Sequence, residues 1–276
     1  ASMKKVNFIK MQSLGNDFII IDNLVSPYNS FSKKEIKKIC DRNYGVGCDQ
    51  LLILKKSKKR HISFTYKIFN KDGTESGQCG NGAKCVAKYY FDKYGKNKKQ
   101  INVETMTKEI KLSNPSKNKY IIDMGIPNFS PKEFLSRNKY FNYMNKKYFF
   151  HVVEIGNPHA IFFLKNIDKI NIEDFSMKFS KKKFFKNGTN LSIVEKVSQG
   201  NWKAKVYERG SGETMSCGSA ACAIATSAKS YNKHFKKSNY VHMQGGKALV
   251  KWNGETGDSA FLIGGAEYVF NGTFIE

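Results

Sequence analysis

The stretch "KIFNKDGTESGQCGNGAKCVA", residues 67–87, decides the fold, because the chain repeats it as "KVYERGSGETMSCGSAACAIA", residues 205–225. One constant offset of 138 residues aligns the two copies and pairs Cys79 with Cys217, each followed by glycine. In each copy an alternating apolar stretch, a polar loop, Cys-Gly and a helix-favouring run follow one another. The pattern therefore predicts a strand, a loop and a helix that starts at the cysteine, twice in one chain.

The repeat extends upstream with nearly the same offset. "LGNDFIIID" matches "IGNPHAIFF", and "DQLLIL" matches "TNLSIV". Each half thus supplies, in one order, a Gly-Asn beside an apolar strand, a side-chain amide at the head of a strand and a polar residue at the end of a strand. The paired positions are Asn16 with Asn157, Gln50 with Asn190, and Asn70 with Glu208. We expect two similar α+β domains related by a pseudo-twofold axis, with the site in the cleft between them.

The domain boundaries follow from the linker signal in "SNPSKNK", residues 113–119, where proline and polar residues gather. We expect an N-terminal domain over residues 3–119 and a C-terminal domain over residues 120–263. The terminal "GGAEYVFNGTFIE", residues 264–276, is predicted to return to the first domain as a strand.

The composition indicates a chain that forms a core and has a strongly basic surface. Of 276 residues 40% are hydrophobic, and the net charge is +24. Only four of the 47 basic residues are arginine, and the lysines are scattered, which argues against nucleic acid as a partner. No apolar run approaches the roughly 18 residues of a membrane span. We expect a soluble, cytoplasmic protein that binds neither membrane nor nucleic acid.

Six cysteines occur, at positions 40, 48, 79, 85, 217 and 222. A disulfide framework is typical of short secreted chains, and the close cysteine pairs lack the Cys-x2-Cys spacing that structural zinc favours. We therefore expect no metal site. We interpret Cys40, Cys48, Cys85 and Cys222 as buried core thiols.

The two remaining cysteines are predicted to lie at helix starts. There a sulfur meets unpaired backbone N–H groups and the positive end of the helix dipole, both of which stabilise a thiolate. Gly80 and Gly218 allow a ligand to approach the backbone closely. Asn81 and Ser219, with the neighbouring N–H groups, can hold a carboxylate. Each half therefore offers one reactive thiol and one anion cradle.

Twin thiols suit a reaction with two proton transfers. A cysteine protease pairs one cysteine with one histidine and has no use for a symmetric twin. If one sulfur is thiolate and the other thiol, the first removes a proton from a carbon and the second delivers a proton to the opposite face. The sequence therefore predicts a cofactor-independent racemase or epimerase.

Six segments together resemble the diaminopimelate epimerase family, in its order and spacing, from about Val6 to Gly272. They are "SLGNDFIIID" (13–22), "GVGCDQLL" (45–52), "FNKDGTESGQCGNGAKC" (69–85), "GNPHA" (156–160), "YERGSGETMSCGSAACA" (207–223) and "GGAEYVFNG" (264–272). The resemblance implies two pseudo-symmetric α/β domains, each a mixed sheet wrapped around a central helix, and a homodimer. It also implies cofactor-free interconversion of LL- and meso-2,6-diaminopimelate, in the biosynthesis of lysine and peptidoglycan precursors.

Matching positions carry the family's site onto this chain. The resemblance makes Cys79 and Cys217 the acid/base pair, with His159 and Glu208 adjusting their protonation. It makes Arg209 the partner of the substrate's distal carboxylate. The substrate-binding positions that it implies are Asn16, Gln50, Asn70, Gly80, Asn81, Asn157, Asn190, Glu208, Arg209, Gly218 and Ser219.

Three alternatives stay open. A proline or hydroxyproline racemase would share the fold, although Arg209 beside Glu208 favours the longer diamino diacid. A basic nucleic-acid-binding protein would need its lysines gathered on one face. A non-catalytic relative would normally have lost a thiol or a cradle glycine, and this chain keeps both.

Overall fold

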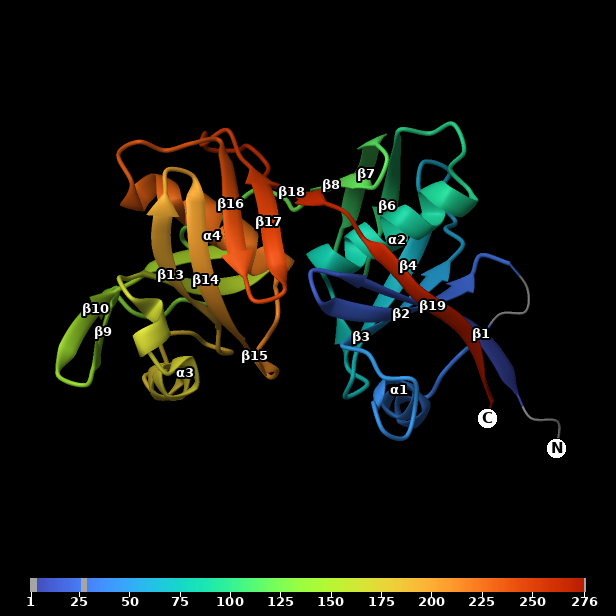
Figure 1. Cartoon of the computed structure of the whole chain (residues 1–276), viewed down its shortest axis with the longest axis horizontal. Coiled ribbons are helices and arrows are strands. Elements are labelled where there is room, and N and C mark those ends of the chain that lie inside the picture. Colours follow the sequence, from blue (N-terminus) through green and yellow to red (C-terminus); the bar gives the residue numbers. More distant parts are fainter. Residues whose placement is uncertain (1–3, 26–28, 276) are drawn as a thin grey trace. The chain divides into compact units, whose positions relative to one another are not determined.

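The computed structural model describes residues 4–25 and 29–275 of the chain (Figure 1). By its internal contacts the chain divides into unit 1, residues 1–122 and 264–276, and unit 2, residues 123–263. Met3 and Glu276, the expected outer limits of the first domain, lie outside the described residues. Within those described ranges, no helix is both long and apolar enough to span a membrane.

Unit 1 is a mixed sheet with two helices. Its helices are α1 (Lys33–Cys40) and α2 (Gly80–Lys93), and its strands are β1 (Lys5–Ser13), β2 (Asn16–Asn23), β3 (Gln50–Lys55), β4 (Phe64–Asn70), β5 (Glu75–Ser76), β6 (Gln100–Glu104), β7 (Glu109–Ser116), β8 (Lys119–Asp123) and β19 (Glu267–Ile275). The strand order is β19–β1–β2–β3–β4–β6–β7–β8, with β5 paired to β4. Helix α2 packs against β1, β2, β3 and β7, so the sheet wraps around it (Figure 1).

Unit 2 repeats this arrangement. Its helices are η1 (Ile167–Lys169), α3 (Ile172–Ser180) and α4 (Gly218–Tyr231), and its strands are β9 (Tyr140–Tyr143), β10 (Lys146–Phe149), β11 (His151–Ile155), β12 (Asn157–Phe163), β13 (Asn190–Ser198), β14 (Asn201–Glu208), β15 (Gly212–Glu213), β16 (Ser238–Met243), β17 (Gly246–Lys251) and β18 (Phe261–Gly264). The order is β11–β12–β13–β14–β16–β17–β18, with β15 paired to β14. Helix α4 packs against β11, β12, β13, β16 and β17.

The two sheets agree strand by strand. The parallel pairs are β2–β3 and β4–β6 in unit 1, and β12–β13 and β14–β16 in unit 2. Their registers agree as well, since Phe18 lies opposite Gln50 and His159 lies opposite Asn190. The prediction of two pseudo-symmetric domains, each a mixed sheet around a central helix, is confirmed.

Successive side chains along the strands point to opposite faces of the sheet, so the core has two layers. In β2, Ile19 and Ile21 pack with Ile36 and Ile39 of α1 on the outer face of the sheet. Phe18 lies on the opposite face, against α2. In unit 2 a cluster of aromatic side chains fills the corresponding space between the sheet and α3. The central helices are buried on nearly all sides, which their small and apolar residues allow.

The linker predicted at residues 113–119 is wrong. β7 continues through Ser116, and β8 begins at Lys119, so this segment is a hairpin of the unit 1 sheet. Asn118 makes the turn with a φ of 50°, a conformation that asparagine tolerates. Pro115 falls where the pairing register shifts, so the hydrogen bond that proline cannot donate is not required there.

Candidate functional site

Both repeated cysteines start the central helix of their unit. Cys79 is the N-cap of α2, and its Sγ accepts the backbone N–H of Gly82 at 3.3 Å. Cys217 is the N-cap of α4, and its Sγ accepts the backbone N–H of Ala220 at 3.4 Å. The predicted placement at a helix start is confirmed for both residues. Each sulfur therefore lies where helix N–H groups stabilise negative charge.

Four amide side chains of unit 1 form two hydrogen-bonded pairs, one of them at the helix start. Asn16 begins β2, and its Oδ1 lies 3.9 Å from the Sγ of Cys79 and 3.4 Å from the Nδ2 of Asn81. Gln50 begins β3 and donates to the Oδ1 of Asn70, at the end of β4, at 2.9 Å. The predicted order of strand heads and strand ends thus creates two connected pairs of polar groups.

Unit 2 carries a different set of polar groups. The Oγ of Ser219 lies 3.3 Å from the Sγ of Cys217. Asn190 begins β13, and its Oδ1 accepts the backbone N–H of Arg209 at 2.8 Å. The guanidinium of Arg209 donates to the backbone carbonyl of Asn187 at 2.7 Å. Asn190 and Asn187 therefore hold the chain that follows β14 in position.

His159 lies fully buried in β12, between Val153 of β11 and Asn190 of β13. Burial lowers its pKa to about 3, so the ring is neutral near neutral pH. Neither ring nitrogen makes a hydrogen bond within the described residues. A neutral imidazole can orient a neighbour but cannot supply positive charge to a thiolate. Asn157 begins the same strand, and Glu208 ends β14.

The repeat pattern did not predict the residues that support Asn16 and Asn70. Asn16 donates through Nδ2 to the carboxylate of Asp49 at 2.8 Å. Asn70 donates to the Oγ1 of Thr74 at 3.1 Å. One feature of the sequence could have indicated Asp49: it directly precedes Gln50, within "GVGCDQLL" (45–52). A side chain that supports another makes no repeat of its own, so the pattern did not identify it.

The other four cysteines are buried, as predicted for core thiols. The sulfurs of Cys40 and Cys48 lie 3.4 Å apart at the end of α1 and before β3. Burial raises the pKa of the Cys85 thiol in α2. Within residues 4–25 and 29–275, no three His, Cys, Asp or Glu side chains are grouped to hold a metal ion.

Solved structures define the class of the fold. A hydroxyproline epimerase from Agrobacterium vitis superposes with a TM-score of 0.73 at 11% identity, covering 98% of this chain and 92% of its own. A phenazine biosynthesis protein of the PhzF family from Bacillus anthracis superposes with a TM-score of 0.71 at 18% identity, covering 99% of both chains. The protein therefore has the two-unit fold shared by these proteins.

Sequence relatives identify the family. The diaminopimelate epimerase family model matches residues 8–130 and 151–269. Diaminopimelate epimerase from Carboxydothermus hydrogenoformans is 35% identical, over 98% of this chain and 99% of the relative. Diaminopimelate epimerase from Vesicomyosocius okutanii is also 35% identical, over 97% and 98%. The chain belongs to the diaminopimelate epimerase family and is an amino-acid epimerase, which confirms the resemblance.

Proposed function

We propose that this protein interconverts LL- and meso-2,6-diaminopimelate through two thiols and without a cofactor. One observation carries the proposal. Each central helix begins at a cysteine whose sulfur accepts the backbone N–H three residues further on, at 3.3 Å for Cys79 and 3.4 Å for Cys217. Such a geometry prepares both sulfurs for the same chemistry, as a symmetric proton transfer requires. The names of the relatives support the choice of substrate.

This mechanism requires one thiol for each face of the substrate's stereocentre. The thiolate removes the α-proton from one face of the stereocentre and becomes a thiol. The thiol on the other face delivers its own proton to the resulting carbanion and becomes a thiolate. The carbon leaves with inverted configuration, and the next turnover in the reverse direction restores the starting protonation.

The neighbours of the two sulfurs favour different resting states. The carboxylate of Asp49 only accepts hydrogen bonds, so Asn16 must turn its Nδ2 toward it and its Oδ1 toward Cys79. An amide oxygen beside sulfur stabilises the S–H form. The Ser219 hydroxyl beside Cys217 can instead donate to a thiolate. We propose that Cys217 is the thiolate and Cys79 the thiol in the resting enzyme.

The remaining candidate residues bind the substrate in this proposal. The helix starts at Gly80 with Asn81, and at Gly218 with Ser219, cradle the carboxylate at the reacting end. Arg209 pairs with the distal carboxylate, which is the charge that distinguishes the diamino diacid from proline. Asn16, Gln50, Asn70, Asn157, Asn190 and Glu208 bind the amino groups and the remaining oxygens. His159 lies beside Asn190 as a buried, neutral group in this proposal.

Incubation with LL-diaminopimelate in deuterated water tests the function. The delivered proton comes from a thiol that exchanges with solvent, so early meso product should carry deuterium at the inverted carbon. The remaining LL substrate should stay largely unlabelled at early times. Product poor in deuterium would contradict the two-thiol mechanism. Cys85→Ala, which alters a buried thiol of the same helix, should leave the labelling pattern unchanged and serves as the control.

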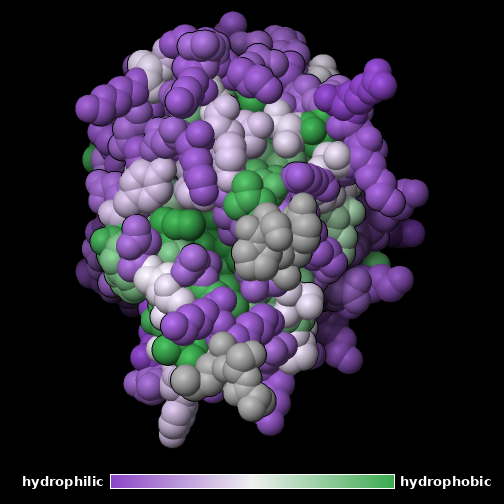
Figure 2. All heavy atoms as spheres, turned by 90° about the vertical axis from the view of Figure 1, so that its right-hand side faces the viewer, coloured by the Kyte–Doolittle hydropathy of each residue, from purple (hydrophilic) through white to green (hydrophobic). Residues whose placement is uncertain are grey.

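We also propose a homodimer that forms through β19, the C-terminal strand of unit 1. Among the described strands of this unit β19 pairs with β1 alone, and Tyr268, Val269 and Phe270 are exposed on it. Figure 2 shows apolar side chains at the surface amid hydrophilic ones on one face of the molecule. An exposed apolar edge strand favours association with a second copy.

A cytoplasmic location is part of the proposal, because the mechanism needs both thiols reduced.

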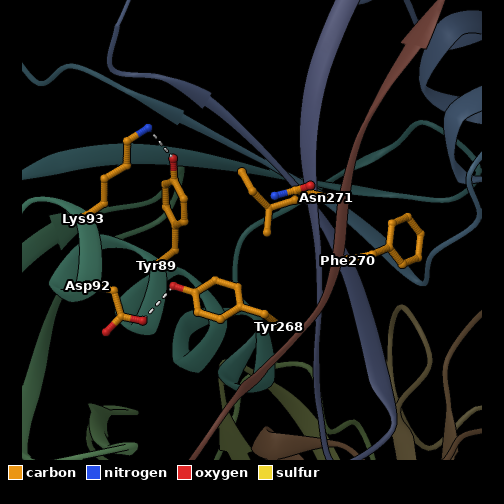
Figure 3. Close-up of a pocket in the computed structure, with 7 residues that line it drawn as sticks. Tyr89, Asp92, Lys93, Tyr268, Phe270 and Asn271 are labelled. Carbon is orange, nitrogen blue, oxygen red and sulfur yellow. Dashed lines mark hydrogen bonds between the residues drawn. The ribbon is translucent and has the colours of Figure 1, made fainter.

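A groove beside β19 supports this interface. A cavity of about 650 Å³ lies between α2 and β19 (Figure 3). The Tyr268 hydroxyl donates to Asp92 of α2 at 2.8 Å, which holds that ring at the edge of the groove. Light scattering after size exclusion should give the mass of a dimer. Val269→Asp should give a monomer, whereas Val197→Asp on β13, a similarly exposed valine, should leave the dimer intact. A monomeric wild type would contradict the interface.

A further inference from the structure

The amide of Asn16 is held from behind by a carboxylate. Its Nδ2 donates to the Oδ2 of Asp49 at 2.8 Å, and its Oδ1 points to Cys79 and Asn81. Asn16 heads β2, and Asp49 directly precedes β3, so parallel pairing of these strands brings the two residues together. An amide has one donor side and one acceptor side, and a carboxylate fixes which side faces it. Asp49 therefore determines that an acceptor faces Cys79.

The Asp49 carboxylate is itself held by two further groups. Its Oδ2 also accepts the backbone N–H of Asp17 at 3.1 Å, and its Oδ1 accepts from Arg42 at 3.2 Å. Asp17 in turn accepts from Arg42 through both oxygens at 2.8 Å and from Lys10 at 2.6 Å. The two carboxylates and two cations balance in charge. Since every oxygen of Asp49 is engaged, the carboxylate has a single orientation.

The corresponding position of unit 2 lacks this carboxylate. The residue before β13 is Thr189, whose hydroxyl donates to the backbone carbonyl of Pro158 at 2.9 Å. The side chain of Asn157, the counterpart of Asn16, makes no hydrogen bond within the described part of unit 2. The half-site of Cys79 therefore has a carboxylate that supports its amide, whereas the half-site of Cys217 has Thr189 at the matching position. This difference breaks the symmetry between the two half-sites.

We propose that Asp49 is a positioning residue that, through Asn16, keeps Cys79 in its thiol form. This inference rests on the proposed function, which needs one protonated sulfur. Without Asp49, the amide of Asn16 can turn and present its N–H donors to the sulfur, which would favour the thiolate instead. Burial raises the pKa of Tyr66 on β4 and the pKa of Cys85 on α2, so neither changes its charge across neutral pH. A negative charge on Cys79 also raises the pKa of both groups.

The test measures the pH dependence of Cys79 alkylation by iodoacetamide in the full chain, with peptide mass spectrometry. Asp49→Ala should move the midpoint of that curve to lower pH by about one unit, the effect of one hydrogen bond. Asn16→Ala should also move it down, since it removes the acceptor. The double variant should move it no further than Asn16→Ala alone, because Asp49 acts only through Asn16. Shifts that add, or no shift in Asp49→Ala, would overturn the proposal.

Two controls keep the outcome interpretable. Cys85 should stay protected from alkylation in every variant, which shows that unit 1 remains folded. If Asp49→Ala does not fold, Asp49→Asn replaces it, because one amide oxygen cannot serve both Arg42 and Asn16, and the same shift is required. Thr189→Ala should leave the curve of Cys79 unchanged. Midpoint shifts in a chain that epimerises nothing would refute the proposed function and leave the role of Asp49 intact.

Discussion

Replacing Asp17 by asparagine should destabilise unit 1 by about 3 kcal/mol. The Lys10 side chain is 8% exposed, and its ammonium donates to Asp17 at 2.6 Å and to the carbonyl of Gly47. Asparagine removes the charge that compensates this buried cation, and such a loss costs about 3–5 kcal/mol. We take the lower value because Arg42, the other cation on Asp17, is 58% exposed and can turn to solvent.

Pulsed alkylation of buried cysteines measures this effect within unit 1. Tryptophan fluorescence cannot, because Trp202 and Trp252 both belong to unit 2. Cys85 in α2 and Cys222 in α4 are both fully buried, so each reports the opening of its own unit. Since about 1.4 kcal/mol is a factor of ten, Asp17→Asn should speed the alkylation of Cys85 about 100-fold. The alkylation of Cys222 should change little.

Two further variants complete this test. Glu109→Gln breaks an exposed ion pair with Lys59 and should change the alkylation rate of Cys85 less than about fivefold. Lys10→Met in the Asp17→Asn background should restore most of the protection, because it removes the buried cation that Asp17→Asn leaves unpaired. A change of less than about fivefold in Asp17→Asn itself would refute the claim that Asp17 compensates a buried charge.

Lowering the pH should remove the contribution that ionised Asp17 makes to the stability of unit 1. Burial alone would raise the pKa of Asp17, but hydrogen bonds from Arg42 and Lys10 outweigh it and hold the pKa well below 3.8. A carboxyl with a lowered folded-state pKa stabilises the fold above its unfolded-state pKa, and this contribution is lost as the pH falls below that value. Between about pH 5 and pH 3 the wild type should therefore lose more thermal stability than Asp17→Asn, as measured by circular dichroism. Equal losses would contradict the assignment.

Three further outcomes follow from the site and its surroundings. Cys79→Ala and Cys217→Ala should each lower epimerase turnover about 100- to 10,000-fold while the chain stays folded, and near-normal turnover in either would make that thiol structural. At neutral pH iodoacetamide should modify Cys217 faster than Cys79, although Cys217 is only 7% exposed, because the thiolate is the nucleophile; the opposite order would reverse the resting assignment. Gly45→Ala should lower stability by about 1–3 kcal/mol in thermal unfolding, because its Cβ would lie 1.8 Å from the carbonyl oxygen of Lys38.

The sequence by itself determined the repeated architecture and the positions of the helix starts. Cys79 and Cys217 cap their helices because an extended residue, then Gly and a helix-favouring run, specify that geometry locally. Gln50 and Asn190 begin strands because apolar alternation starts directly after them. These properties depend on neighbours along the chain, and a twofold repeat doubles their signal.

Tertiary structure alone decided which side chains support the site. Asp49 reaches Asn16 because α1 returns the chain so that β3 lies parallel to β2, a pairing across 33 residues. The pattern around Pro115 looks like a linker, yet a register shift in the sheet accommodates it as part of a hairpin. His159 became neutral through burial between two strands. Hydrogen-bond partners and burial depend on what lies across space, and spacing along the chain does not contain that information.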